Sequence, residues 1–375
     1  MTFPPAAGIR LSVLDRSRIR RGEEPARALR DTVRFARQVE ALGYHRFWVA
    51  EHHGVPGVAG SAPTVLAAAV AAATSVIRVG TGGVMLPNHR PLVVAEQFGV
   101  LESLHPGRID MGLGRSVGFT DGVRRALGRD KAAADDFDAQ LTELLGYFTG
   151  DRTGGPRVRA RPAEGLRPQP FVLATGAGAQ VAADLGLPLV IGAVRGEEAM
   201  LRAIDGYRRG FRPSHWAERP YVVVAGNVAV AATAERAREL LVPEAWSLAH
   251  SRVHGEFPPL VPAEEIAARP MGDRERGYFD EALRGHVYGT PEEAATALAA
   301  LTARSGADEI LVTTSSYDRA ALLESYRALA RLAGLRAPAG TAPDTGTAPG
   351  TGTAPDTGTA PDTGAWAGAG ATPVS

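Results

Sequence analysis

Residues 9–17 read IRLSVLDRS, and this stretch decides between two folds that the rest of the chain allows. Residues 9–14 form a short, mostly apolar run of the kind that makes a strand of a parallel sheet. A doubly wound open sheet would normally follow its first strand with a glycine-rich turn that binds a dinucleotide. Here the run continues into Asp15-Arg16-Ser17, which contains no glycine. The sequence therefore favours the other fold, a closed (β/α)8 barrel of the TIM type.

Seven more apolar runs follow the first, and most are separated by segments in which apolar residues recur with helical spacing. The expected strands are residues 9–14, 46–50, 77–86, 108–113, 171–174, 189–192, 221–230 and 309–313. Helices are expected at residues 25–42, 63–75, 92–104, 137–148, 179–185, 291–304 and 317–332. Parallel strands joined by right-handed crossovers close into a barrel, so we expect one α/β barrel with insertions over residues 1–336.

The end of the chain has a different composition. Residues 341–364 consist of four hexads, TAPDTG, TAPGTG, TAPDTG and TAPDTG, which hold no large apolar side chain. Proline and glycine oppose helix formation, and such a segment cannot bury enough surface to offset the entropy cost of ordering it. We therefore expect residues 337–375 to be a disordered tail, although a spacer or docking arm is also compatible with this composition.

Composition excludes several classes of protein. The 375 residues carry 41 basic and 41 acidic side chains, which argues against binding to nucleic acid or a membrane surface through bulk charge. The absence of cysteine excludes disulfides, iron–sulfur clusters and thiolate zinc sites. The N-terminus lacks the pattern of a signal peptide, and no window has the roughly 18 apolar residues of a membrane span. These features predict a cytoplasmic protein.

Glu51-His52-His53 follows the second expected strand, and active sites of such barrels lie at the C-terminal ends of the strands. A histidine there could act as a general acid or base near neutral pH. Adjacent residues of an extended chain point to opposite sides, so only one histidine can face the cavity unless the chain turns. Two histidines satisfied by hydrogen bonds at the rim are equally compatible with the sequence. We expect no metal site, because these neighbouring histidines lack the i, i+4 spacing of a zinc-binding helix.

Two glycine-containing segments follow later strands. Gly114-Arg115-Ser116 ends the fourth, and arginine matches phosphate oxygens with two parallel donors. Thr175-Gly176-Ala177 ends the fifth and precedes an expected helix, whose first amides favour an anion. Each segment alone is also compatible with a plain surface turn. Together on one barrel rim they predict a phosphorylated ligand.

Gly82-Gly83 interrupts an otherwise apolar strand, and Gly80 lies just before it. Small residues relieve crowding inside a barrel, and a flat ligand lying against the backbone would need them as well. The sequence leaves both explanations open.

In the segments at these strand ends, the sequence resembles the luciferase-like, flavin-dependent monooxygenase superfamily. The resemblance extends from residue 11 to residue 333 and is most specific in YHRFWVAEHHG (44–54), IRVGTGGVMLP (77–87), AEQFGVLESLHPGRIDMGLGR (95–115) and VYGTPEE (287–293). Members of this superfamily have a (β/α)8 barrel, which agrees with the fold expected from the apolar pattern.

The resemblance implies a site where reduced FMN, supplied by a separate reductase, and O2 oxidise a small organic substrate. It assigns the catalytic role to His52 and binding of the flavin phosphate to Arg115, with Ser116 and Val117 beside it. It also implies a cis peptide bond between Gly82 and Gly83, next to the flavin ring. The complete set of cofactor-binding residues expected is Gly82, Gly83, Gly114, Arg115, Ser116, Val117, Thr175, Gly176 and Ala177.

The sequence departs from its nearest-looking relatives in two places. Those relatives have a serine-rich segment after the fifth strand, where residues 173–179 here are shorter and Thr175 is the only hydroxyl. Residues 193–196 also lack the aromatic side chains expected after the sixth strand. Both departures bear on how the chain would hold a phosphate and a substrate.

Three functions are therefore considered. The first is an FMN-dependent monooxygenase, which the Glu51-His52-His53 segment favours; no NAD(P)H-binding glycine motif is present to reduce flavin internally. The second is a deazaflavin-dependent oxidoreductase that transfers hydride, and the third is a flavin-binding homologue without catalysis. Trp48, Met85 and Phe119 suggest an apolar substrate, although each is equally plausible as core. The resemblance also implies a homodimer formed through helices beside the second and third strands, and the alanine-rich helix at residues 63–75 is small enough to pack closely there.

Overall fold

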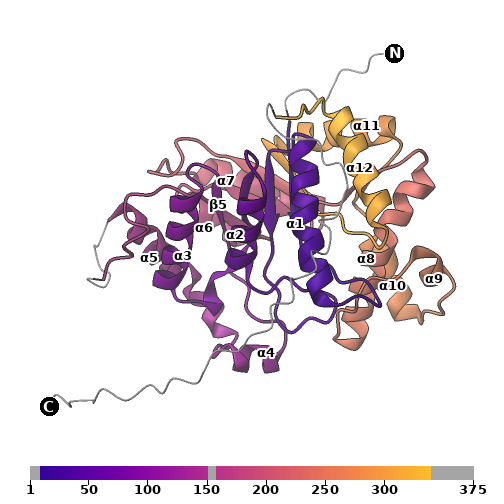
Figure 1. The fold of residues 1–375 in the computed structure, drawn as a ribbon, viewed down its shortest axis with the longest axis horizontal. Coiled ribbons are helices and arrows are strands. Elements are labelled where there is room, and N and C mark those ends of the chain that lie inside the picture. The colour runs from indigo at the N-terminus through magenta and orange to yellow at the C-terminus, as the bar shows by residue number, and fades with distance from the viewer. Residues whose placement is uncertain (1–8, 151–157, 339–375) are drawn as a thin grey trace, which may run out of the picture. The chain divides into compact units, whose positions relative to one another are not determined.

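A computed structural model describes residues 9–150 and 158–338. The predicted tail lies outside this part of the chain, apart from residues 337 and 338. A closed, parallel eight-stranded barrel forms the centre, with helices around it (Figure 1). The strands follow one another in the order β3-β2-β1-β11-β8-β7-β6-β5-β4, and pairing of β3 with β5 closes the ring. The predicted TIM-type fold is thus confirmed.

The barrel strands match the apolar runs of the sequence with small shifts at their ends. They are β1 (Arg10–Asp15), β2 (Arg46–Val49), β3 (Arg78–Thr81), β4 (Val84–Met85), β5 (Ile109–Gly114), β6 (Gln169–Ala174), β7 (Leu189–Gly192), β8 (Val222–Gly226) and β11 (Glu309–Val312). The strands β3 and β4 are consecutive parts of one predicted strand, and both pair with β5.

The larger helices are α1 (Pro25–Ala41), α2 (Pro63–Ala73), α3 (Pro91–Leu104), α5 (Phe137–Thr149), α7 (Glu197–Gly210), α8 (Ala234–His254), α10 (Asp273–Ala282), α11 (Pro291–Ser305) and α12 (Arg319–Leu332). Shorter ones are α4 (Asp121–Ala126), α6 (Gly178–Asp184), α9 (Ala263–Ala267), and the 3-10 turns η1 (Leu86–Asn88) and η2 (Ala132–Asp136). The predicted capping box at the start of α11 is present, with Thr290 and Glu293 each accepting a backbone N–H.

Two predicted strands were wrong in their extent. Residues 77–86 do not form one strand, because the peptide bond between Gly82 and Gly83 is cis and η1 begins at Leu86. Residues 221–230 divide at Asn227 into β8 and β9 (Val228–Val230). The strand β9 leaves the barrel and pairs with β10 (Val287–Gly289), which the sequence analysis did not predict. Hydroxyl groups of Thr314 and Ser325 accept the backbone N–H groups of β9, so it needs no barrel neighbour on that side.

The prediction also missed α7, α8, α9 and α10. The last three gather on one side of the barrel (Figure 1), where α8 packs against both α9 and α10. The hydrophobic spacing of α8 is weak because this helix contacts β9 and β10 as well as α9 and α10, and Pro243 lies inside it. In the described residues no helix is long and apolar enough to cross a membrane.

Charged side chains occupy the inside of the barrel at the N-terminal ends of its strands. Arg46 of β2 contacts Asp110 of β5 at 2.8 Å and Glu309 of β11 at 3.1 Å, and both carboxylates are fully buried. Burial acts to raise the pKa of Asp110, but Arg46 and Arg78 outweigh it and lower that pKa. Trp48 completes the group by donating its indole N–H to Asp110 at 2.9 Å.

Replacing Asp110 with asparagine should lower the free energy of unfolding by about 3–5 kcal/mol, because Arg46 then stays buried with one carboxylate partner removed. Urea denaturation followed by circular dichroism measures this change. Asp205 is exposed in the middle of α7, so Asp205→Asn serves as the control and should change stability by about 0.5 kcal/mol or less. Equal stability of the two variants would contradict a structural role for the buried cluster.

Candidate active site

A cavity of about 900 Å3 opens at the C-terminal ends of the barrel strands. Ends of β1, β5, β6, β7 and β8 contribute to its lining, and α8 and α10 add residues on one side. This is where enzymes with this barrel place their active sites, because the loops that follow the strands converge there. The cavity is therefore the candidate site, and the predicted residues can be tested against it.

Most predicted site residues come together at this cavity. His52, Gly82, Gly83, Gly114, Arg115, Ser116, Thr175, Gly176 and Ala177 all contribute to its lining, whereas Val117 does not. Of the three candidate substrate contacts, Met85 and Phe119 lie at the cavity, with Phe119 74% exposed. Trp48 is instead fully buried and packs against Phe171 inside the barrel. Trp48 is therefore a core residue, which was the alternative to a substrate contact.

The Glu51-His52-His53 segment separates its histidines as the sequence predicted. The Glu51 carboxylate is buried and contacts Nε2 of His53 at 2.8 Å and Nε2 of His89 at 2.9 Å. It also accepts the backbone N–H of Met85 at 2.9 Å. Burial acts to raise the pKa of Glu51, but the hydrogen bonds from His53 and His89 outweigh it and lower the pKa to about 2. Glu51 is therefore a fixed anion that holds His53 away from the cavity lining.

His52 is left facing the cavity. Its backbone N–H donates to the carbonyl of Gly60 at 2.8 Å, while its ring Nδ1 is buried and has no hydrogen-bond partner in the described residues. Burial, together with the positive charges of Arg16 and Arg18, lowers the pKa of His52 to about 4. The imidazole that lines the cavity is consequently neutral at pH 7.

Arg16 is a cavity residue that the sequence analysis used only to argue the fold. It follows β1, contacts Glu244 of α8 at 2.6 Å and donates to the carbonyl of Thr313 at 2.7 Å. The position directly after a barrel strand was the available signal for it. After burial, the positive charge of Arg16 is the next cause that lowers the pKa of His52.

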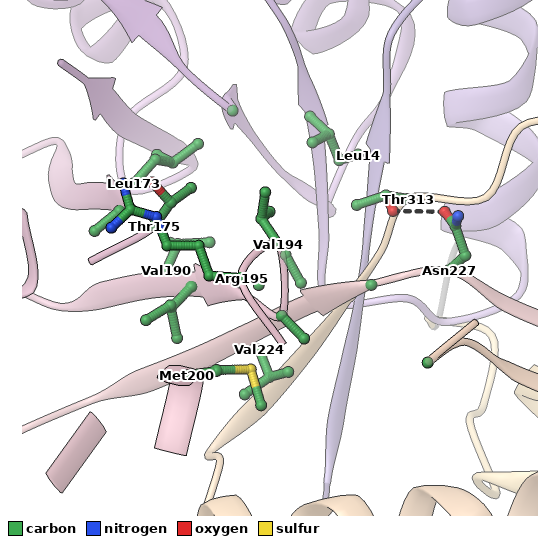
Figure 2. A pocket seen from close by; sticks show the side chains of 18 of the residues that line it. Leu14, Leu173, Thr175, Val190, Val194, Arg195, Met200, Val224, Asn227 and Thr313 are labelled. Atoms are coloured by element: carbon green, nitrogen blue, oxygen red, sulfur yellow. Dashed lines mark hydrogen bonds between the residues drawn. The ribbon is translucent and has the colours of Figure 1, made fainter. Parts of the chain in front are cut away.

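The opposite part of the rim is basic. Arg115 follows β5 and lies half-exposed, 3.3 Å from Asp135. Arg195, in the loop after β7, lies beside Thr175 (Figure 2), and a Cβ placed on Gly176 would be 3.4 Å from its Nη1 atom. Arg195 forms no ion pair with any described residue. Arg195 was not predicted as a site residue, because the sequence of residues 193–196 is notable only for its lack of aromatic groups.

Backbone at the cavity is also open to a ligand. A Cβ added to Gly114 would meet only the carbonyl oxygen of Val84, at 3.9 Å, so it would occupy cavity space. At Gly83 the nearest atoms are those of Gly112, at 2.9 Å, which means that this glycine also serves strand packing. Strand packing, one of the two explanations left open for Gly82-Gly83, is therefore present at Gly83, and contact with a flat ligand stays a prediction.

A family model for luciferase-like monooxygenases matches residues 9–309. The chain belongs to the luciferase-like monooxygenase family. A luciferase-like monooxygenase of Escherichia coli (strain K12) is 35% identical over 320 residues, covering 85% of this chain and 95% of that protein. The crystal structure of apo-MsnO8 is 32% identical and superposes with a TM-score of 0.76, covering 87% of this chain and 98% of MsnO8.

More distant structures share the fold with different cofactors. The oxygenating constituent of 3,6-diketocamphane monooxygenase from Pseudomonas putida, in complex with FMN, is 16% identical with a TM-score of 0.65 and covers 88% of this chain and 99% of its own. An F420-dependent secondary alcohol dehydrogenase is also 16% identical, with a TM-score of 0.64, and covers 87% and 99%. At this identity the similarity concerns the fold alone.

The lowered pKa of His52 predicts that its imidazole stays neutral as the pH falls from 7 to about 4. A titration of histidine ring signals by NMR, assigned with a His52→Gln variant, measures this pKa directly. Arg16→Gln should raise the pKa of His52, because it removes a positive charge that disfavours the imidazolium. A midpoint near the ordinary value of about 6.5 in the unaltered protein would contradict the described environment.

Proposed function

We propose that this protein is a monooxygenase that uses reduced FMN and O2 to oxidise a small apolar organic molecule. The observation that carries the proposal is a single cavity in which a neutral histidine, His52, lines one region and Arg195, which has no ion-pair partner among the described residues, lies at another. Family membership supports the reaction class, and the FMN complex of 3,6-diketocamphane monooxygenase supports the choice of flavin.

The residues present fit a flavin phosphate. Arg115 and Arg195 supply positive charge, and Ser116 and Thr175 supply hydroxyls at the same rim. Arginine donates two parallel hydrogen bonds to phosphate oxygens, which compensates for the serines that the segment after β6 lacks. In this arrangement Arg195 takes over part of a phosphate site that relatives build from hydroxyl groups.

The flavin ring would lie against the backbone of Gly82, Gly83 and Gly114. Bound in the reduced state, FMN would supply the electrons that activate O2. His52 lines the same cavity, so its imidazole can hydrogen-bond or take a proton from the reacting molecule. Because its pKa is lowered to about 4, the imidazole is neutral at pH 7 and serves as a hydrogen-bonding group or as a weak base, and little imidazolium is present to act as an acid.

Apolar side chains fill the inner wall of the cavity. Figure 2 shows Leu14, Leu173, Val190, Met200 and Val224 around it, and all of them contribute to the lining. Polar groups lie on another part of the wall, where the hydroxyl of Thr313 donates a hydrogen bond to Oδ1 of Asn227 at 2.8 Å. This distribution supports a largely apolar substrate with one polar group.

A deazaflavin-dependent hydride transfer is the alternative, and the F420-dependent alcohol dehydrogenase of the same fold supports it. The phosphate-binding arginines would serve either cofactor, so they do not separate the two functions. Binding of flavin without catalysis is the third candidate. FMN is preferred here because the relatives of higher identity carry the monooxygenase description.

A separate flavin reductase and a second copy of the chain are the proposed partners, in the cytoplasm. The proposal of a homodimer rests on α2 and α3, where Val65, Val93 and Leu104 are exposed by 69%, 46% and 67%. Exposed apolar side chains on adjacent helices favour contact with another protein surface.

Replacing Arg195 with alanine should weaken FMN binding about ten- to a hundredfold, because a charge-assisted hydrogen bond contributes roughly 1.5–3 kcal/mol. Riboflavin, which has no phosphate, should bind the variant and the unaltered protein equally. Quenching of flavin fluorescence gives these affinities, and the same titration with F420 shows which cofactor the protein prefers. Arg202→Ala, which removes an exposed arginine of α7, is the matched control. An equal loss for riboflavin would argue against a phosphate contact.

His52→Asn should retain FMN binding and lose about a hundred- to ten-thousandfold in turnover, the range expected when a group that transfers a proton is removed. O2 uptake and product formation with reduced FMN and a panel of small apolar substrates measure the effect. Unchanged turnover in this variant would remove His52 from the mechanism. If the unaltered protein binds FMN but oxidises none of the panel, the non-catalytic alternative gains support.

A further inference from the structure

A second group of histidines lies outside the cavity, on the side of the barrel covered by α8 and α10. His250 and His254 stand four residues apart in α8, so they occupy the same face of that helix. Glu275 lies in the first turn of α10 and faces them. Ligand atoms of the three side chains all lie within 4.8 Å of one another.

We propose that His250, His254 and Glu275 bind a divalent transition-metal ion of the Zn2+ class that joins α8 to α10. Two imidazoles four residues apart, with a carboxylate from another segment, are a frequent ligand set for such ions, and water completes the coordination. This site is separate from the cavity and does not rest on the proposed function.

Distances between the ligand atoms fit this ion. In a tetrahedral zinc site with bonds of about 2.0–2.1 Å, ligand atoms lie about 3.4 Å apart. Nδ1 of His250 is already 3.4 Å from Oε1 of Glu275. The rings of His250 and His254 lie 4.2 Å apart between centroids at an angle of 32°. His254 is exposed at the end of its helix, so a small rotation of its side chain completes the set.

The arginines near Glu275 contact other side chains, so they do not compete with the histidines for this carboxylate. Arg252 pairs with Glu281 at 2.8 Å, and Arg269 lies over the ring of Trp246. In the described part of the chain no arginine forms an ion pair with Glu275. The carbonyl end of α8 also favours a positive charge, because the last peptide groups of a helix present their oxygens there.

The site lies next to one wall of the cavity. Arg252 of α8 and its partner Glu281 of α10 both contribute to the cavity lining, as does Ala282. A metal ion bound between the two helices would add a second link to the Arg252–Glu281 pair. We therefore expect the ion to stabilise α10 in its position beside the cavity.

The experiment is calorimetric titration of Zn2+ into the full-length chain, prepared without a polyhistidine tag and freed of metal by a chelator. We expect one site per chain, with affinity at least about a hundredfold weaker in His254→Ala and in Glu275→Gln, since each removes a direct ligand. His215 is exposed and is not one of the three proposed ligands. His215→Ala is therefore the control and should bind Zn2+ like the unaltered protein.

Hydrogen exchange gives a second readout that does not depend on flavin or activity. Zn2+ should slow exchange of the α10 amides in the unaltered protein and in His215→Ala, but not in His254→Ala. Three results would each overturn the proposal: no Zn2+ binding by the unaltered protein, binding that persists unchanged in both ligand variants, or binding without any change in α10.

Discussion

The contact of Arg46 with Asp110 and Glu309 organises the barrel, because it links three strands across the interior. Two buried carboxylates would repel each other without the guanidinium between them, and each would carry the cost of leaving water. The cluster fills the N-terminal part of the barrel with hydrogen-bonded charge. Inside the barrel, the space open to a ligand therefore lies toward the opposite, C-terminal ends of the strands.

The inward-facing residues form layers above this cluster. Along β1, Ser12 contacts Glu309 in the charged layer, Leu14 reaches the cavity, and Arg16 lies at its mouth. Side chains two residues apart on a strand face the same way, so the register of the barrel sets these heights. Trp48 and Phe171 pack in the middle layer and separate the buried charges from the site. That separation allows one barrel to hold both a fixed ionic cluster and a cavity for a ligand.

At the site, charged side chains in fixed positions determine the hydrogen bonding and protonation of the histidines. Glu51 is held as an anion by its hydrogen bonds and engages His53 and His89, which leaves His52 as the histidine available to the cavity. Arg16 and burial then keep His52 neutral. The Glu51 carboxylate binds His53 and His89 but not His52. This difference in partners separates His52 from the other two histidines.

Local patterns of the sequence were enough to predict the barrel and its helices α1, α2, α3, α5, α6, α11 and α12. They also predicted ten candidate site residues, of which nine meet at the cavity. Those features follow from local patterns: apolar periodicity, capping residues, and the rule that strand ends carry the site. Tertiary structure alone decided that Arg195 lies beside Thr175, that Trp48 is core, and that β9 leaves the barrel. It also brought Glu275 to the histidines of α8. Contacts between residues distant in sequence depend on packing and register, which no local pattern of one chain records.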